Sequence, residues 1–379
     1  MGYVLKKINV LMFVSNTNKK SGVATVIMNY YSNVYEAVHM DFIYFEDLDT
    51  NNYNDQIRKY GGRIYKFPSP FKFIDFRKQL KDFCSEHYKE YDIFHYHFPF
   101  LGVFFIDISK LLGRCVVISH AHATKFGECL ISNLRNGVAA KLSVNVPDYY
   151  FACSKKAGVH NFGNRFNSDK GYVVNNAIQL KHFVFSAENR DSARDELGMQ
   201  DKFVVGHIGN FTPQKNHIFI IDVFNEILKR NRKAELLLIG DGYLRACIKE
   251  KTEKLGIASN VHFTGVRNDV GRLLSGMDLF LFPSLFEGLG IALIEAQTNG
   301  LPCLVSDVIP EEAKICNCIE LSLNKSAKEW SEVALRDVHR ESDAYDLVKN
   351  AGFDLDIEST KLVDIYRKCI KDRGESNAI

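Results

Sequence analysis

Short, continuous apolar runs alternate along this chain with stretches in which apolar residues recur at helical spacing. Residues 8–15 form the first apolar run, and residues 23–31 follow with helical spacing after a polar loop that ends in Ser21-Gly22. Continuous apolar runs are typical of strands buried on both faces of a parallel sheet. The first half of the chain repeats this alternation, with further strands expected at residues 40–44, 63–67, 93–97, 115–120, 149–152 and 171–174 and helices at 55–60, 71–87 and 104–112.

After Asn175-Asn176 the same alternation begins again. Strands separated by helices indicate a doubly wound parallel sheet, so two successive α/β domains are expected. A chain of 379 residues is also too long for a single core. We therefore expect an N-terminal domain at residues 1–180, a C-terminal domain at 181–358, and an amphipathic helix at 359–379 that packs back on the first domain. Strands of the second domain are expected at 203–208, 235–239, 261–264, 279–282, 303–306 and 318–321.

Residues 279–300 form one strand–loop–helix unit with features that suit a phosphate ligand. The predicted helix starts directly after the loop, and a helix N-terminus offers unpaired N–H groups and partial positive charge. Gly288 and Gly290 allow a ligand to approach the main chain. Glu287 in the loop and Glu295 in the helix add two carboxylates, which in many α/β domains are solvated or cap a helix.

Other polar residues follow neighbouring predicted strands. Lys215 ends the loop that begins at Gly209, and His120 and His122 end a strand of the first domain. In open α/β sheets ligands bind beyond the carboxyl ends of the strands, so a cleft between two such domains is the expected site. A lone histidine at a strand end is more often structural, but two within three residues favour a functional role.

Composition excludes several classes of protein. The nine cysteines include no CxxC pair, so a zinc site is not expected and a reduced cytoplasmic compartment fits better than a disulfide scaffold. No signal peptide is expected, and charged residues interrupt the most apolar window, residues 98–119. No GxGxxG follows the first strand, and the basic residues lack interleaved aromatic residues, so neither a nicotinamide cofactor nor a nucleic acid is expected.

Charge is unevenly distributed between the two halves. Residues 1–175 hold 22 Lys+Arg and 15 Asp+Glu, a balance of +7, and the remainder holds 26 and 31, a balance of −5. A basic first half suits an anionic lipid surface or an acidic acceptor. A surplus of solvated lysines explains the count equally well. The expectation is a cytoplasmic protein that attaches peripherally to the inner face of the plasma membrane.

Motifs in this order resemble the GT-B-fold glycosyltransferases of family 4, the retaining nucleotide-sugar enzymes of bacterial polysaccharide and glycolipid synthesis. The most specific motif is Glu287, seven residues, then Glu295. The other matching segments are Ser21-Gly22, His95-Tyr96-His97, Ile118 to His122, Phe151 to Ser154, Asn175 to Ile178, Gly206 to His217 and Gly240-Asp241-Gly242. The resemblance implies a GT-B fold, with two Rossmann-like domains facing across a cleft.

The resemblance also implies a hexosyltransferase that moves a sugar from a nucleotide-sugar donor, expected to be a UDP-sugar, to a lipid-linked or oligosaccharide acceptor in capsule or exopolysaccharide synthesis. Catalysis then depends on stabilising charge on the departing diphosphate. No metal ion or other cofactor is expected to be required. The acceptor hydroxyl attacks from the same face, so no enzyme nucleophile is needed.

Residue roles follow from the same resemblance. Lys215, Glu287 and His122 are the expected catalytic residues, with His120 an open alternative to His122 for contact with the donor sugar. Glu295 is expected to accept hydrogen bonds from the ribose hydroxyls. The expected donor-binding set is completed by Gly22, Gly209, Asn210, Val266, Gly288, Leu289 and Gly290.

One departure from the family pattern bears on donor binding. The family usually has an arginine where this chain has Asn210, and charge-assisted hydrogen bonds are about twice as strong as neutral ones. Asn210 therefore indicates weaker donor binding, compensation by Arg267 or another base, or low activity. Two alternatives remain at this point: a sugar-nucleotide 2-epimerase on the same fold, and a non-catalytic nucleotide-sugar-binding subunit. The donor sugar, the acceptor, the linkage and the oligomeric state stay open.

Overall fold

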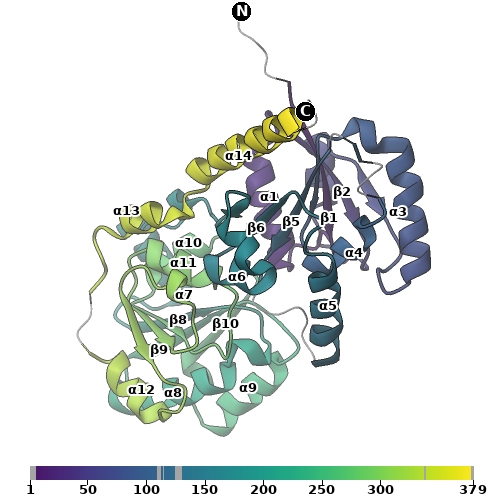
Figure 1. Cartoon of the computed structure of the whole chain (residues 1–379). Helices are drawn as coiled ribbons and strands as arrows, with labels where there is room; N and C mark the ends of the chain where they lie inside the picture. The colour runs from purple at the N-terminus through teal and green to yellow at the C-terminus, as the bar shows by residue number, and fades with distance from the viewer. Residues whose placement is uncertain (1–5, 109–111, 114, 124–129, 337–338, 377–379) are drawn as a thin grey trace, which may run out of the picture. The chain divides into compact units, whose positions relative to one another are not determined.

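The protein folds into two compact units, each built on its own parallel sheet (Figure 1). The structure, a computed structural model, describes residues 6–108, 112–113, 115–123, 130–336 and 339–376. Unit 1 comprises residues 1–178 and 355–379, and unit 2 comprises residues 179–354. The division falls after Ile178 and after Asp354. The boundaries expected from the sequence, after residues 180 and 358, lie two and four residues further along the chain.

Within the described residues, unit 1 holds a seven-stranded parallel sheet in the order β3-β2-β1-β4-β5-β6-β7. The strands are β1 (Ile8–Val14), β2 (Val38–Tyr44), β3 (Ile64–Lys66), β4 (Ile93–Tyr96), β5 (Val116–Ala121), β6 (Tyr149–Ala152) and β7 (Gly171–Val173). The helices are α1 (Gly22–Val34), α2 (Asn54–Lys59), α3 (Phe73–His87), α4 (Gly102–Phe105), α5 (Leu130–Leu142) and α6 (Lys155–Phe162).

Unit 2 repeats the arrangement with a six-stranded parallel sheet, counted over the described part of the chain, in the order β10-β9-β8-β11-β12-β13. The strands are β8 (Phe203–Ile208), β9 (Ala234–Ile239), β10 (Val261–Gly265), β11 (Leu279–Phe282), β12 (Cys303–Ser306) and β13 (Cys318–Leu321). The helices are α7 (Ala187–Leu197), α8 (His217–Arg230), α9 (Arg245–Lys254), α10 (Val270–Gly276), α11 (Ile291–Thr298), α12 (Ala327–Ala334) and α13 (Ala344–Val348).

The apolar runs of the sequence become the central strands of both sheets. Every residue of β4, β5, β6, β9, β11 and β12 is buried. Strands that lie between helices on both faces of a parallel sheet have no solvent-facing side, which explains why they are not alternately polar. The predicted α/β class with two doubly wound sheets is confirmed.

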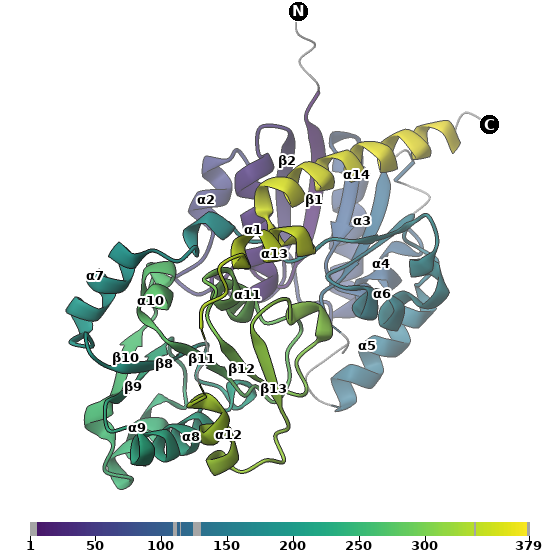
Figure 2. The same ribbon diagram turned by 90° about the vertical axis from the view of Figure 1, so that its left-hand side faces the viewer.

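The last helix, α14 (Leu355–Ser376), belongs to unit 1 although it follows unit 2 in sequence. It runs beside α1 in both views (Figures 1 and 2). The hydroxyl of its fully buried Tyr366 lies 2.8 Å from Nδ1 of His95, within hydrogen-bond distance, and Arg373 pairs with Asp148 at 2.7 Å. The chain therefore closes unit 1 with its C-terminal segment.

Some elements differ from the expectations. The helix expected at residues 104–112 is a shorter helix, α4, that begins two residues earlier, and residues 109–111 lie outside the described residues. The sequence analysis did not list α5, α6, α7, α12 or α13. Among the helices that the structure describes, none combines the length and apolarity needed to cross a membrane.

Candidate functional site

Unit 2 has its topological switch point between β8 and β11. Its strand order is that of the dinucleotide-binding fold, in which the first strand lies at the centre and the fourth strand starts the second half. In such sheets ligands bind beyond the carboxyl ends of the two central strands, because the following loops diverge there and leave a crevice. The loops after β8 and β11 carry Lys215 and Glu287, two of the expected catalytic residues.

Lys215 and Glu287 form an ion pair across this switch point. Nζ of Lys215 lies 2.6 Å from Oε1 of Glu287, and the two side chains are 16% and 5% exposed. The ammonium group also stands 4.9 Å from the centre of the Phe282 ring at the end of β11. The sequence assigned these residues to different parts of the donor, whereas the structure brings their charged groups into direct contact.

Hydrogen bonds hold the two loops together around this pair. Gln214 donates from Nε2 to Oε2 of Glu287 at 3.2 Å and to the Phe286 carbonyl at 3.0 Å. Asn216 donates from Nδ2 to the Pro283 carbonyl at 3.1 Å and adopts a left-handed backbone conformation, which asparagine tolerates better than most residues. Sequence reasoning missed Gln214; its position next to Lys215 was the available signal.

Backbone N–H groups follow Glu287 at the start of α11. Gly290 is the N-cap residue with φ +89°, and no side chain of the described residues caps this helix. The first two amides of α11 are thus available to an anion, whereas the third donates to the Gly290 carbonyl at 2.9 Å. The Leu289 side chain is 5% exposed, so only its main chain could meet a ligand, and Gly288 lies in the same loop.

Glu295, on α11, is a half-buried carboxyl group that has no hydrogen bond or ion pair among the described residues. Desolvation raises the pKa of Glu295 to about 8, while the charge of Lys215 opposes that rise. A carboxyl group with a strongly raised pKa beside a fixed cation is a typical functional-site group.

The loop after β8 contains two other expected donor-binding residues, Gly209 and Asn210. A Cβ on Gly209 would lie 3.0 Å from Cγ of Lys215 and 3.1 Å from Nε2 of His207. Close packing against these two side chains is therefore enough to favour glycine at this position, without a ligand. Asn210 is exposed, and no side-chain hydrogen bond of Asn210 is present within the described part of the chain. Its amide is therefore available to a ligand.

Val266 and Arg267 follow β10 at the next loop. Val266 is 74% exposed, unusual for a valine and suited to a ligand contact. Arg267 is held by Asp269 at 2.8 Å and by Glu196 at 3.1 Å, and these hydrogen bonds raise its pKa. In this structure Arg267 is thus committed to two carboxylates and does not supply a spare charge in place of the arginine that Asn210 replaces.

Unit 1 has its own switch point, between β1 and β4. Gly22 opens α1 in the loop beyond β1, and a Cβ there would meet no atom within 4 Å, so the fold itself does not require glycine. The Ser21 hydroxyl caps α1 by accepting from the Ala24 N–H at 3.4 Å.

His95 and His97 on and after β4, and His120 and His122 on and after β5, place four imidazole rings side by side. Nδ1 of His97 lies 2.8 Å from Nε2 of His122. His120 is buried, and neither ring nitrogen has a hydrogen-bond partner among the described residues, whereas His122 is half-buried. Of the two rivals, His122 is therefore the more accessible to a ligand.

Burial governs the protonation of these rings. Desolvation lowers the pKa of His122 to about 4 and holds the pKa values of His95, His97 and His120 well below their usual range, with neighbouring rings adding to the shift in those three. All four imidazoles are thus neutral near pH 7, and each has one N–H donor and one acceptor nitrogen.

Comparison with known proteins agrees with this geometry. Residues 189–318, which include the Lys215–Glu287 pair and Glu295, match the family model "Glycosyl transferases group 1". The chain is a GT-B-fold glycosyltransferase. It is 28% identical over 94% of its length to "Putative glycosyltransferase EpsF" of Bacillus subtilis (strain 168), of which the match covers 96%.

Two further comparisons extend this result to a second relative and to a solved structure. The glycosyltransferase is 27% identical to the Escherichia coli protein named "UDP-Gal:alpha-D-GlcNAc-diphosphoundecaprenol alpha-1,3-galactosyltransferase". The match covers 65% of this chain and 66% of that protein. Its fold is similar, with a TM-score of 0.76 and 17% identity, to the crystal structure of Anabaena Alr3699/HepE in complex with UDP and glucose, covering 95% of this chain and 100% of that one. These comparisons do not favour the 2-epimerase or the non-catalytic subunit.

Proposed function

We propose that this glycosyltransferase transfers a sugar, with retention of configuration, from a UDP-sugar to a lipid-linked or saccharide acceptor in surface polysaccharide synthesis. The observation that carries the proposal is the Lys215–Glu287 pair at the switch point of unit 2, beside the uncapped start of α11. Two similar proteins support UDP as the nucleotide of the donor. One is named for a UDP-Gal donor and a diphosphoundecaprenol acceptor, and the other was crystallised in complex with UDP and glucose.

In this proposal the diphosphate of the donor binds between Lys215 and the first amides of α11. Negative charge grows on the diphosphate as the sugar leaves, and a fixed ammonium group with oriented N–H donors stabilises it without reorganising. Transfer is then expected without added Mg²⁺ or Mn²⁺. The exposed Asn210 amide offers further hydrogen bonds to the phosphate oxygens, but no charge.

The two carboxyl groups take different parts of the donor. Glu295 accepts hydrogen bonds from the ribose diol, and the main chain near Val266 faces the base. Glu287 holds the sugar and its oxocarbenium-like transition state, and His122 is the catalytic residue that we assign in unit 1. Because Glu287 contacts Lys215 directly, the sugar and diphosphate positions are coupled through one ion pair.

A donor screen followed by a transfer assay tests this proposal. The nucleotide-sugar that raises the melting temperature most is identified first, since a ligand that binds the native state stabilises it. That donor, radiolabelled, is then incubated with a lipid extract with and without the protein. Label in a lipid or saccharide product supports the proposal, whereas free epimer or binding without turnover contradicts it.

Two variants connect the activity to the ion pair. Lys215→Met removes a cationic donor to the leaving diphosphate, and Glu287→Gln removes the negative charge that faces the oxocarbenium-like sugar. Each is expected to lower kcat by at least about a hundredfold. Lys254→Met, which removes an exposed lysine of α9 that pairs with Glu250, is the matched control and is expected to keep full activity. Full activity in either pair variant would contradict the assignment.

We also propose that unit 1 attaches to anionic membranes through α5. Four apolar residues follow one another at helical spacing on this helix and are exposed: Ile131 (80%), Leu134 (71%), Val138 (50%) and Leu142 (72%). Arg135 stacks 3.9 Å from the centre of the exposed Phe71 ring, which extends the apolar strip to the segment before α3. Apolar residues next to basic ones are the pattern of an interfacial helix.

Vesicle flotation tests the attachment. Binding is expected to vesicles that contain anionic lipid and to weaken at high salt, because part of the attraction is electrostatic. Replacing Ile131 and Leu134 together by glutamate should abolish it, whereas Leu255→Glu on the surface of unit 2 should not. Equal binding to neutral vesicles, or no binding at low salt, would contradict this part of the proposal.

A further inference from the structure

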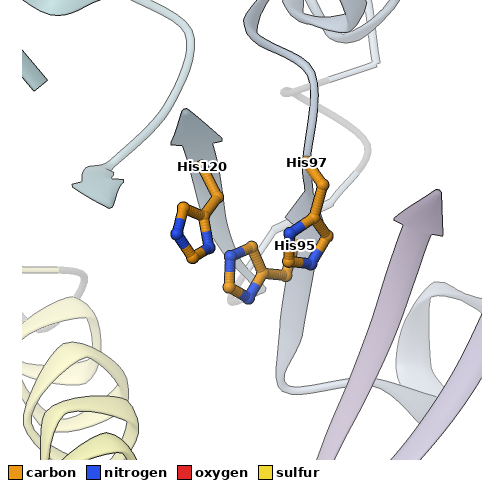
Figure 3. A group of neighbouring side chains, drawn as sticks. All are labelled: His95, His97 and His120. Carbon is orange, nitrogen blue, oxygen red and sulfur yellow. The ribbon is translucent and has the colours of Figure 1, made fainter. Parts of the chain in front are cut away.

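Three buried histidines of unit 1 stand close enough to share one ligand. One ring nitrogen from each of His95, His97 and His120 lies within 4.8 Å of the other two (Figure 3). His95 lies on β4 and His97 directly follows its last residue, and β5 runs alongside with Tyr96 opposite Ser119. The three rings therefore project from the same face of the sheet, at the carboxyl ends of two neighbouring strands.

Several of these nitrogens lack hydrogen-bond partners. Nε2 of His95 and both ring nitrogens of His120 are buried and unpaired among the described residues. A buried polar atom without a partner is destabilising, so protein folds rarely leave three in one place. A cavity of about 20 Å³ adjoins the rings. Its lining also includes His122, two tyrosines and several apolar side chains, among them Met12 and Val26.

The surrounding contacts fix the orientation of the rings. Nδ1 of His95 lies 2.8 Å from the Tyr366 hydroxyl of α14, which leaves Nε2 facing the cluster. Nδ1 of His97 lies 2.8 Å from Nε2 of His122, and the second nitrogen of His97 lies 3.4 Å from Sδ of Met12. A metal-bound imidazole usually donates its other ring N–H to a nearby acceptor, and the Tyr366 hydroxyl is placed to accept from Nδ1 of His95.

We propose that His95, His97 and His120 bind one late transition-metal ion, and that this ion is Zn²⁺. Three imidazoles with one further position are a common ligand set for zinc, whereas Mg²⁺ and Ca²⁺ require oxygen ligands that this cluster lacks. A single water would also fit a cavity of this size. We favour a metal ion because each of the three histidines offers a neutral ring nitrogen, the ligand that zinc and its neighbours prefer.

The ion has a structural and positioning role. It ties β4 to β5 and, through Tyr366, to α14. It also fixes His97, whose Nδ1 then carries the proton donated to His122. The proposal does not depend on the transfer reaction, because the diphosphate chemistry lies with Lys215 and α11 of unit 2. No zinc was expected from the sequence because the chain has no CxxC pair, and the spacing of the histidines gave no sign that their rings meet.

Metal analysis of the full-length protein, prepared without a histidine tag, is the direct test. About one equivalent of zinc is expected after gel filtration. Co²⁺ added to the chelator-treated protein should give visible d–d absorption. Wild-type protein that stays well below one equivalent, even after incubation with Zn²⁺, would overturn the proposal, and a water molecule would then fill the cavity.

Variants locate the ion. His95→Asn and His120→Asn should each lower the metal content at least tenfold, whereas His182→Asn, on an exposed histidine of unit 2, should leave it unchanged. Tyr366→Phe keeps the ring and should weaken zinc binding about 10–100-fold, the usual effect of losing an outer-shell bond, even if the asparagine variants fail to fold. An unchanged metal content in the folded variants of these three residues would overturn the assignment.

The UDP-induced thermal shift separates this proposal from the proposed function. UDP binds unit 2 in our account, so folded variants without metal should keep the shift. A protein that holds its ion but never binds UDP would contradict the proposed function alone.

Discussion

At the scale of single residues, we expect Asn210 and Glu295 to set how tightly this enzyme binds its donor. Both lie in unit 2, at the edge of the sheet where Lys215 and Glu287 form their ion pair. Asn210 supplies an uncharged amide where the family pattern has an arginine, and Arg267 is occupied by Asp269 and Glu196. Glu295 is uncharged for much of the time near pH 7, because its pKa is raised to about 8.

Restoring the arginine should strengthen donor binding. Asn210→Arg is expected to lower the Kd for UDP about tenfold, since a hydrogen bond to a charged group contributes roughly 1 to 1.5 kcal/mol more than a neutral one. Isothermal titration calorimetry measures the change, and Asn210→Gln, which keeps an amide, is the control. Equal affinities in the arginine and glutamine variants would show that this position does not face the diphosphate.

Donor binding should also depend on pH through Glu295. If the ribose diol requires the ionised carboxylate, the competent fraction rises from about one-eleventh at pH 7 to about three-quarters at pH 8.5 for a pKa of about 8. UDP affinity should therefore increase about eightfold across this interval, with proton release near pH 7. Calorimetry in buffers of different ionisation enthalpy detects the released proton.

Glu295→Gln is the control for this prediction. It should bind UDP more weakly and release no proton, and any remaining pH dependence belongs to the nucleotide itself. A wild-type protein that behaves like the glutamine variant would contradict the ribose assignment.

At the scale of elements, we expect the backbone conformation at the start of α11 to control the binding of UDP. Gly290 stands there with φ +89°, in the left-handed region that side chains with a Cβ adopt at a cost. An added Cβ would also lie 3.2 Å from Cε1 of Phe282 in β11. The orientation of the first amides of α11 therefore depends on this glycine.

Gly290→Ala is expected to destabilise the protein by about 1–2 kcal/mol and to weaken UDP binding. Gly61→Ala is a matched control, because Gly61 has nearly the same φ of +90° in unit 1 with no atom within 4 Å of an added Cβ. It should lose similar stability and keep its affinity for UDP. Thermal unfolding with and without UDP measures both effects; equal loss of affinity in the two variants would contradict the role of α11.

At the scale of the whole molecule, α14 decides the integrity of unit 1. Its residues Leu362, Val363, Tyr366 and Cys369 are buried, and Tyr366 contacts His95 at the centre of the sheet. Burying an apolar side chain of this size contributes about 1.5–3 kcal/mol, so removing the helix costs an amount comparable to the whole stability of a typical domain.

A chain that ends at Asp354 should therefore lose the fold of unit 1 and keep that of unit 2, which is complete at that residue. Limited proteolysis should digest residues 1–178 rapidly and leave a fragment of unit 2 that still shifts its melting temperature with UDP. A truncated chain as resistant to protease as the full-length protein would contradict this role of α14.

Much of the fold could be predicted from the sequence, because buried parallel strands leave continuous apolar runs. The strands at residues 203–208, 279–282 and 303–306 were predicted with the bounds that the structure has. Helices such as α5 and α12 were missed. α12 spans only eight residues, which is shorter than the window in which helical periodicity is recognised, and the apolar residues at helical spacing on α5 are exposed rather than packed in a core.

The sequence by itself determined the α/β class, the repetition of one sheet pattern, and the motif order that indicates a glycosyltransferase, because these depend on local composition and spacing. Only the tertiary structure decided which distant residues meet. The contact of Lys215 with Glu287 depends on two strands lying together at a switch point, and the histidine cluster depends on the register of β4 and β5. The raised pKa of Glu295 likewise arises from desolvation, which no local pattern specifies.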